Sequence, residues 1–295
     1  MRALVISGGG CKGAYAGGIA EYLIHVEKIK YELFVGSSTG SLLIPLLSLA
    51  KTEKLKNIFT SVTQKDIFSS CPFIIRKRKD EYRTSINHLG ILKMFMKGKK
   101  TFGETFSLRK LICSIVNEDD FNQMKSASSD VVVSVSNLST GQVEFKSLNE
   151  NSYHDYCDWI WASASAIPFM SLVEKNGCEY ADGGLGSLIP IAEAIRRGAC
   201  EIDVIVLKSE KADDNKKPVR NALELTTRTF DFMLNQIAKD DIDLGVLHGV
   251  NKNVKLNFYY PPKTLTNNSL IFDPVQMSAW WKDGYLFAEN KNCCS

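Results

Sequence analysis

The segment Tyr31–Leu43 constrains the fold more than any other part of the sequence, because it joins a strand to a helix through a sharp turn. Its sequence is YELFVGSSTGSLL: an apolar run with strand character ends at Gly36, and a helix-like run follows Gly40. The corner fits G-x-S-x-G, with Ser38 at its centre. In such a turn the serine adopts a strained backbone conformation that lifts its hydroxyl clear of the sheet, and a Cβ at either flanking glycine would collide with a neighbouring strand or helix. The segment therefore predicts an α/β fold with an exposed serine at this corner.

The chain opens with the same order of elements. Residues 1–7 (MRALVIS) have the pattern of a short buried strand, the loop 8–13 (GGGCKG) follows at once, and a helical run over residues 14–27 comes next. Strands of parallel sheets are hydrophobic nearly throughout, as residues 1–7 are. A glycine loop at a helix N-terminus directs several backbone N–H groups at one point. The loop is therefore a candidate anion site.

Two interpretations compete for this loop. Gly8, Gly10 and Gly13 fit the dinucleotide pattern G-x-G-x-x-G, which also requires an acidic residue at the end of the second strand to hold the ribose. Here the second strand runs into Gly36, Ser37 and Ser38, so that acid is missing. A loop that merely turns the chain stays possible, although three consecutive glycines carry a high entropic cost for an idle turn.

The rest of the chain alternates strands with helices. Strands are expected at 130–136, 142–148, 201–208 and 255–260, with a hairpin over 169–180 that turns at Asn176-Gly177. Helices are expected at 41–51 (bent or begun afresh near Pro45), 108–116, 154–162, 190–197 and 221–250, and a last one begins at Asp273-Pro274. This alternation predicts a three-layer α/β sandwich with a mostly parallel central sheet, formed as a single domain over residues 1–295.

Composition excludes several classes of protein. The apolar content is 44% and the charged content 23%, which is ordinary for a globular chain with a sizeable core. The net charge of +3 is too small to indicate nucleic-acid binding. We find no signal peptide and no apolar run near the ~20 residues of a membrane span. The eight cysteines lack metal-ligand spacing, so we expect free thiols in a cytoplasmic protein with no metal and no cofactor.

Charge is concentrated between residues 76 and 100. This segment holds nine Lys or Arg against two acids, a local net charge of +7, and interleaves them with Leu, Ile, Met and Phe. Basic and apolar residues together suit a segment that rests on an anionic membrane surface, or a lid over an apolar cleft. A solvated insertion helix with a basic face is an equal alternative. The segment belongs to an expected insertion at about 71–129, and a helical extension is expected after about 210.

A serine nucleophile needs a base, and the sequence offers few. Of the four histidines only His248 comes late, as a Ser-His-Asp hydrolase requires, and it falls in a helical stretch. His25, His88 and His154 have the settings of surface or packed residues. The alternative is Asp182, which is followed by two glycines that permit close approach. An aspartate needs partial burial to act as a base near neutral pH. A simpler alternative is that Asp182 caps the loop after its strand.

Three motifs taken together resemble the patatin-like phospholipase family: GGGCKG at 8–13, GSSTG at 36–40 and DGG at 182–184. The short gap between the first two and the run of small residues 163–168 before the aspartate are similar to that family as well. The resemblance spans about residues 1–208. Segments 71–129 and the chain after about 210 do not match the family pattern, and we expect them to set substrate choice.

The resemblance implies a patatin-like fold and lipid acyl hydrolysis by a Ser-Asp dyad without histidine. It implies Ser38 as the nucleophile in the elbow between Gly36 and Gly40, and Asp182 as the general base. The oxyanion hole is implied at the glycine loop, from the N–H groups of Gly8, Gly9 and Gly10, with Lys12 at a position usually held by arginine and Gly13 completing the motif.

The sequence therefore predicts a serine esterase of the phospholipase A or lysophospholipase type. We expect a phospholipid or other acyl-lipid substrate, no nucleic-acid partner, and peripheral contact with membranes through residues 76–100. Acyl transfer and hydrolysis of non-phospholipid esters remain alternatives on the same dyad. Two readings from other classes also stay open: a nucleotide-binding protein that uses GGGCKG for phosphates, and a lipid-binding module without turnover.

Overall fold

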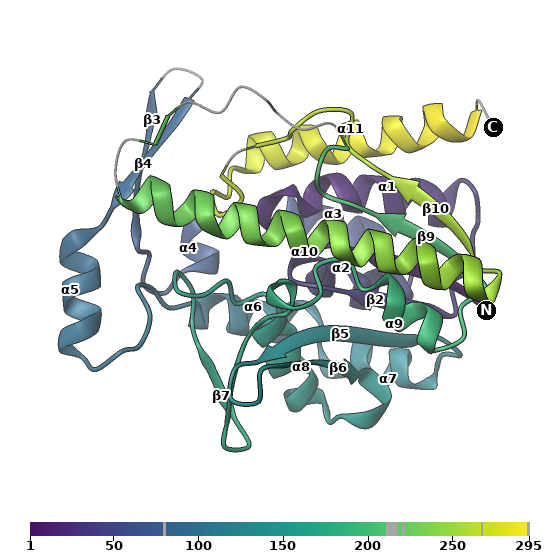
Figure 1. The fold of residues 1–295 in the computed structure, drawn as a ribbon, viewed down its shortest axis with the longest axis horizontal. Helices are drawn as coiled ribbons and strands as arrows, with labels where there is room; N and C mark the ends of the chain where they lie inside the picture. The colour runs from purple at the N-terminus through teal and green to yellow at the C-terminus, as the bar shows by residue number, and fades with distance from the viewer. Residues whose placement is uncertain (79–80, 211–217, 220–221, 267, 294–295) are drawn as a thin grey trace.

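The structure is a computed structural model that describes the whole chain except residues 79–80, 211–217, 220–221, 267 and 294–295 (Figure 1). Eight strands form one sheet in the order β10-β9-β1-β2-β5-β8-β7, with β6 paired to β5, and β3 and β4 form a separate two-stranded sheet. The strands are β1 Arg2–Ile6, β2 Leu33–Gly36, β3 Phe73–Arg78, β4 Glu81–Ile86, β5 Asp130–Asn137, β6 Gln142–Ser147, β7 Val173–Lys175, β8 Cys178–Asp182, β9 Glu201–Ile205 and β10 Lys255–Tyr259.

The main sheet is mostly parallel, as predicted. Strands β10, β9, β1, β2 and β5 are paired in parallel, whereas β6 and β8 run antiparallel to β5, and β7 antiparallel to β8. The expected strands at 130–136 and 142–148 pair as the antiparallel β5 and β6, and the predicted hairpin over 169–180 is present as β7 and β8. Its turn lies at Asn176 and Gly177, whose φ angles of 52° and 75° are the left-handed values that a tight two-residue turn needs.

Helices cover both faces of the sheet. The helices are α1 Gly13–His25, α2 Thr39–Ser48, α3 Thr52–Phe59, α4 Gln64–Ile67, α5 His88–Met96, α6 Phe106–Ile115, α7 Glu118–Ser126, α8 Tyr153–Ser163, α9 Ile191–Arg196, α10 Ala222–Lys252 and α11 Pro274–Cys293, with single 3-10 turns at Gly10–Lys12, Leu148–Glu150 and Gly183–Leu185. In the described residues no helix combines the length and the apolar character that crossing a bilayer requires.

Alternate residues of β1 show the two cores that make this a three-layer sandwich. Leu4 and Ile6 are buried in a large core that includes side chains of α1, α2, α8 and α11. Ala3 and Val5 are buried on the opposite face, in a core that α9 and α10 close. Figure 1 shows α10 as a long helix laid across this second face. Because each face of β1 is covered, the strand is apolar and buried from Ala3 to Ile6, as its sequence indicated.

Three expectations need correction. The helix after Ser38 begins at Thr39 rather than Ser41 and runs through Pro45 without a break. Where several helices were expected, a single helix of 31 residues forms, α10 (Ala222–Lys252). The basic segment is not a single insertion helix, since β3 and β4 pair as an antiparallel hairpin and only α5 is helical. The hairpin was missed because its strands are rich in Lys and Arg, which weakens the alternation of apolar and polar residues by which strands are recognised.

The C-terminal part of the chain packs directly on the N-terminal helix. Asp273 accepts a hydrogen bond from the Val275 N–H at 3.1 Å and so caps α11 where the sequence predicted. Helix α11 lies so close to α1 that a Cβ on Gly18 would fall 1.9 Å from the carbonyl oxygen of Trp281. Helix α11 is therefore part of the main core, to which it contributes Met277, Trp280, Trp281 and Ala288.

Candidate active site

Ser38 lies at the corner between β2 and α2. Its φ and ψ of 52° and −120° are a conformation that residues with a Cβ rarely adopt. Both flanking glycines are needed here: an ideal Cβ on Gly36 would lie 2.6 Å from the carbonyl carbon of Gly40, and one on Gly40 would lie 2.2 Å from the Ile6 oxygen. The tight packing of the turn against β1 holds the serine in its strained conformation.

Strand pairing explains why Asp182 meets Ser38, although 144 residues separate them. Gly36, at the end of β2, is opposite Val133 of β5, and Asp182, at the end of β8, is opposite Val135 of the same strand. The Ser38 hydroxyl donates a hydrogen bond of 2.6 Å to Oδ2 of Asp182. The other carboxylate oxygen accepts a bond of 2.8 Å from the Gly184 N–H. This fixes the plane of the carboxylate and turns one oxygen toward the serine.

The environment of Asp182 shifts its titration toward neutral pH. Its side chain is only 7% exposed, and burial raises the pKa of the carboxyl group from 3.8 to about 6, although the hydrogen bonds from Ser38 and Gly184 lower it. Burial disfavours the charged form because the surroundings solvate it less well than water does. A carboxylate with this pKa is ionised at neutral pH and is a stronger proton acceptor than a surface aspartate.

The glycine loop lies against Ser38, but not all of its N–H groups are free to bind a ligand. An ideal Cβ on Gly8 would lie 3.0 Å from the Cβ of Ser38. The Gly8 N–H donates to the Leu188 oxygen at 3.1 Å. Within the described residues the N–H groups of Gly9 and Gly10 donate to no other residue. The set of donors implied by the sequence resemblance is thus reduced to Gly9 and Gly10, because Gly8 is already occupied in holding the loop.

Lys12 and Gly13 shape the loop rather than offer donors. The Lys12 N–H donates to the Gly9 oxygen at 3.3 Å, and the Gly13 N–H is directed to the carbonyls of Gly10 and Cys11. Burial lowers the pKa of the Lys12 ammonium, and the positive charge of Lys208 lowers it further, against the opposing effects of Cys11 and Asp231.

A set of serines behind the elbow was missed in the sequence. The Ser38 N–H donates to the hydroxyl of Ser163 at 3.1 Å, and this hydroxyl lies 2.7 Å from that of Ser41, which in turn bonds the Gly36 oxygen. The Asp182 N–H donates to the Ser165 oxygen at 3.0 Å. The run of small residues at 163–168 therefore supports both members of the dyad. The position of this run just before Asp182 in the sequence indicated that it lies near the site. Spacing alone does not show which hydroxyl contacts which backbone group.

The dyad opens into a cavity of about 1140 Å³. Its floor is the glycine loop with Ser38 and Asp182, and its walls come from distant parts of the chain: α10, the loop before α11, and the β3–β4 hairpin. Apolar side chains predominate on the walls, among them Phe73, Phe169, Met170, Phe230, Leu265 and Phe272. The site can therefore bind a long apolar group next to a serine nucleophile.

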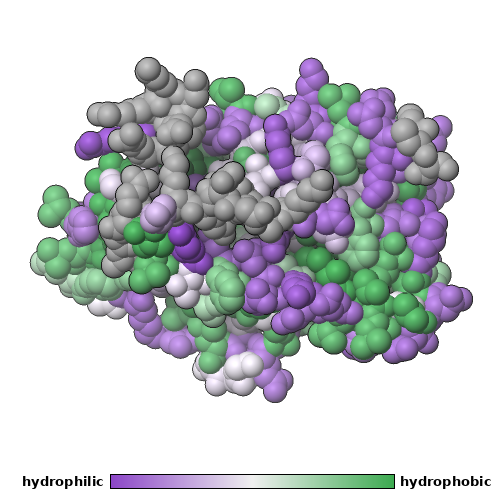
Figure 2. All heavy atoms as spheres, turned by 45° about the horizontal axis from the view of Figure 1, so that its top comes forward, coloured by the Kyte–Doolittle hydropathy of each residue, from purple (hydrophilic) through white to green (hydrophobic). Residues whose placement is uncertain are grey.

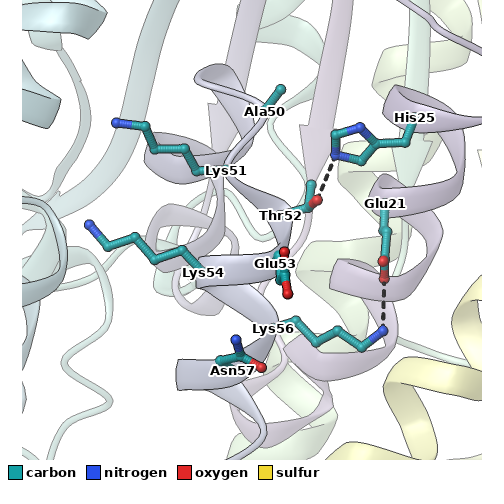
Figure 3. Close-up of a pocket in the computed structure, with 9 residues that line it drawn as sticks. All are labelled: Glu21, His25, Ala50, Lys51, Thr52, Glu53, Lys54, Lys56 and Asn57. Atoms are coloured by element: carbon teal, nitrogen blue, oxygen red, sulfur yellow. Dashed lines mark hydrogen bonds and ion pairs between the residues drawn. The ribbon is translucent and has the colours of Figure 1, made fainter.

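A second hollow, of about 730 Å³, lies away from the dyad beside α1 and α3 (Figure 3). Figure 3 shows His25 bonded to Thr52 and Glu21 paired with Lys56. Its other two lysines, 51 and 54, pair with Asp120. Each of its three lysines is thus already paired with a carboxylate, and no residue of this hollow lines the cavity at Ser38.

None of the four histidines serves Ser38 as a base in the described part of the chain. His25 bonds Thr52, His88 is exposed at the edge of the cavity, and His154 and His248 are exposed on the surface. Among the described residues there is also no group of three or more His, Cys, Asp and Glu side chains that could hold a metal ion. The proton acceptor within reach of the serine is Asp182.

Comparison with known proteins gives a family and a similar fold. A family model described as patatin-like phospholipase matches residues 4–195, which contain all three motifs. Among solved structures, VipD from Legionella pneumophila has a similar fold, with a TM-score of 0.52 over 98% of this chain and 15% sequence identity. The chain spans 66% of the length of that structure. No curated protein matches the sequence.

Proposed function

The chain belongs to the patatin-like phospholipase family, whose members are lipid acyl hydrolases, and we propose that it cleaves carboxylic esters of phospholipids or related acyl-lipids through an acyl-Ser38 intermediate. Asp182 is the general base in this proposal. The observation that carries it is the 2.6 Å hydrogen bond from the strained Ser38 to the buried Asp182 at the floor of an apolar cavity. A serine held in this way, with its hydroxyl on a base, is an activated nucleophile.

The first step forms the acyl-enzyme. Asp182 takes the proton of the Ser38 hydroxyl as its oxygen attacks the ester carbonyl, and the carbonyl oxygen becomes an oxyanion. The N–H groups of Gly9 and Gly10 are the candidates to bind this oxyanion, and losing one such donor typically costs ~10²–10³ in rate. When the tetrahedral intermediate collapses, the C–O bond of the ester breaks and Asp182 returns the proton to the leaving alcohol, which is a lysophospholipid for a phospholipid substrate.

The second step releases the fatty acid. Asp182 takes a proton from a water molecule as the water oxygen attacks the acyl-Ser38 carbonyl. Collapse of this second intermediate breaks the bond to the serine oxygen, and the proton on Asp182 returns to it. The atoms balance as one ester plus one water giving one alcohol and one fatty acid. An alcohol in place of water would transfer the acyl group instead.

A lipid substrate also accounts for the surface around α5. Four side chains on this short helix are exposed although they are large and apolar: Leu89 and Met96 at 81%, Leu92 at 56% and Phe95 at 50%. Figure 2 shows hydrophobic side chains gathered at the end of the molecule that carries α5. The adjoining hairpin contributes Phe73 and Ile86 to the catalytic cavity. A bilayer that contacts α5 would thus lie beside the route to Ser38.

The charges of this surface are fewer than the sequence suggested. Lys99 pairs with Glu104 at 2.6 Å, and Lys100 pairs with Glu174 and Glu179 at 2.8 and 2.7 Å. Acids distant in sequence therefore neutralise part of the basic segment. Among the described side chains Arg76, Lys93 and Lys97 are also on this surface, and all are exposed. We therefore expect apolar insertion to contribute more to membrane contact than attraction to anionic headgroups.

The direct test of the proposed chemistry measures fatty-acid release from mixed phospholipid vesicles. The wild type is expected to release fatty acid, and Ser38→Ala and Asp182→Ala are expected to fall to background while they stay folded by circular dichroism. A fluorophosphonate probe should label the wild type and not Ser38→Ala. Full activity of Ser38→Ala would refute the proposal. Adding an alcohol acceptor to the same assay distinguishes hydrolysis from acyl transfer, since a new ester then replaces free fatty acid.

The membrane contact has a matched control on α10. Leu89→Ser with Met96→Ser should reduce sedimentation with vesicles and slow turnover of vesicle lipid, while a short-chain soluble ester is hydrolysed at the wild-type rate. Val250→Ser, which replaces an apolar side chain that is 75% exposed on another face, should change neither. Equal loss of vesicle binding in both variants would contradict a specific role for α5.

A further inference from the structure

One loop joins the parts of the catalytic centre. The Ser37 hydroxyl, next to the nucleophile, donates a bond of 2.7 Å to the Ser187 oxygen. The Gly8 N–H, at the start of the glycine loop, donates to the Leu188 oxygen at 3.1 Å. The side chain of Leu188 also fills the space over both Gly8 and Gly184, where an ideal Cβ would lie 2.5 and 2.6 Å from its Cδ1. Residues 187–189 thus touch the elbow, the oxyanion loop and the turn that orients Asp182.

The opposite side of this loop is held by a carboxylate from α10. Oδ2 of Asp241 accepts a bond of 2.7 Å from the Ile189 N–H, and Oδ1 accepts the Ser187 hydroxyl at 3.5 Å. A backbone N–H at such a turn has few other partners, so one carboxylate that accepts the Ile189 N–H and the Ser187 hydroxyl fixes the loop conformation.

We propose that Asp241 is a positioning residue for catalysis: it holds residues 187–189 so that the oxyanion loop and the nucleophile elbow keep their reactive geometry. Asp241 lies outside the matched segment 4–195, on a helix that the motifs do not include. It does not contact Ser38 or Asp182, so its effect passes through the two hydrogen bonds that the loop accepts from Ser37 and Gly8. This inference rests on the proposed function, because it concerns the same reaction.

Asp241 is a carboxylate at neutral pH. Burial raises the pKa of its carboxyl group to about 6, and the neighbouring charge of Asp240 raises it further, whereas the hydrogen bonds from Ile189 and Ser187 lower it. At pH 7.5 it therefore accepts all these bonds in its ionised form, which is the stronger acceptor. Measurements at that pH test the positioning role without a change in its protonation.

The test compares Asp241→Ala with Asp243→Ala, a change of the same kind two residues further along α10 at an exposed position. We expect Asp241→Ala to lower kcat by about 10- to 100-fold with KM within about threefold of the wild type, since small displacements of reacting groups are that costly. The rate of fluorophosphonate labelling of Ser38 should fall in parallel. Asp241→Asn keeps one oxygen that can accept the Ile189 N–H. It should therefore recover most of the activity that Asp241→Ala loses, with a kcat about 3- to 10-fold below that of the wild type.

The outcomes separate this inference from the proposed function. The positioning role alone would be overturned if the probe labelled Asp241→Ala as fast as it labels the wild type. It would also be overturned if Asp241→Ala had a lower melting temperature but an unchanged kcat when assayed well below that temperature. If Asp241→Ala does not fold, Asp241→Asn decides: a wild-type kcat overturns the role and a lowered kcat supports it. A wild type that neither releases fatty acid nor reacts with the probe would refute the Ser38 assignment and this inference with it.

Discussion

The buried carboxyl of Asp182 should make the wild type less stable at neutral pH than a variant that lacks the charge. Its pKa is about 6 in the folded protein because burial disfavours the ionised form, whereas the unfolded chain has the ordinary value of about 3.8. Between these two values the folded state binds more protons than the unfolded state. The free energy of unfolding therefore falls as pH rises through this window, and the loss is complete above pH 6.

The magnitude follows from the difference of about 2 between the two pKa values. Each pKa unit corresponds to ~1.4 kcal/mol, so ionised Asp182 should lower the free energy of unfolding by about 3 kcal/mol at pH 8. At pH 5 the same relation gives about 1.5 kcal/mol, because the folded carboxyl is then mostly protonated. Asp182→Asn has nearly the same shape as the protonated acid and can still accept from Gly184, so it should avoid this cost.

The assay is guanidinium denaturation of the wild type and Asp182→Asn at pH 5, 6, 7 and 8. We expect Asp182→Asn to be inactive and more stable, with an advantage that grows by roughly 1–2 kcal/mol from pH 5 to pH 8. The other carboxyl with a pKa near 6, Asp241, is present in both proteins and cancels in the difference. An advantage that is the same at every pH would refute the reasoning, since it would show that the Asp182 pKa does not change on folding.

Three further predictions concern the same site. The kcat/KM of the wild type should fall about tenfold per pH unit below about pH 6, because only ionised Asp182 accepts the proton; a flat profile there would exclude it as the base. Ser163→Ala removes the acceptor of the Ser38 N–H and should lower kcat about tenfold and stability by ~1–3 kcal/mol in denaturant titrations. Gly10→Ala places a Cβ 2.2 Å from the Ser269 oxygen at a φ of +58° and should lower kcat ~10²-fold, whereas Gly98→Ala, also at positive φ but in open space, should leave kcat unchanged.

The parts of the site that follow from local sequence were predictable. A strand, a G-x-S-x-G corner and a helix specify the turn at Ser38, because few other residues tolerate its backbone conformation and packing. The turn at Asn176-Gly177 likewise fixed the hairpin that delivers Asp182. These features depend on steric limits within a few residues, so the sequence contains the information that determines them.

The contacts between distant segments were not predictable. The Gly8 N–H is not available to bind an oxyanion because it donates to the Leu188 oxygen. This contact comes from a loop 180 residues away, and nothing in the sequence near Gly8 indicates it. Asp241 belongs to the run Lys239–Asp243, which has the composition of a solvated helix face. Only the rotation of α10 about its axis decides which of these acids meets the loop, and tertiary packing sets that rotation.

The three motifs contain the residues of the proposed chemistry, but they do not by themselves hold the site in place. The glycine loop is fixed by hydrogen bonds to segments beyond the matched residues: the Cys11 N–H donates to the Ser269 oxygen at 2.9 Å, and the Ser7 hydroxyl accepts the Leu207 N–H at 2.9 Å. The loop 187–189 depends in the same way on Asp241. An oxyanion site stabilises a transition state only if its donors are already held in position before the reaction. A chain cut after residue 208 would keep Ser38, Asp182 and all three motifs. Because it would lack the contacts that hold them, we expect it to lose most of the hydrolytic activity of the full chain.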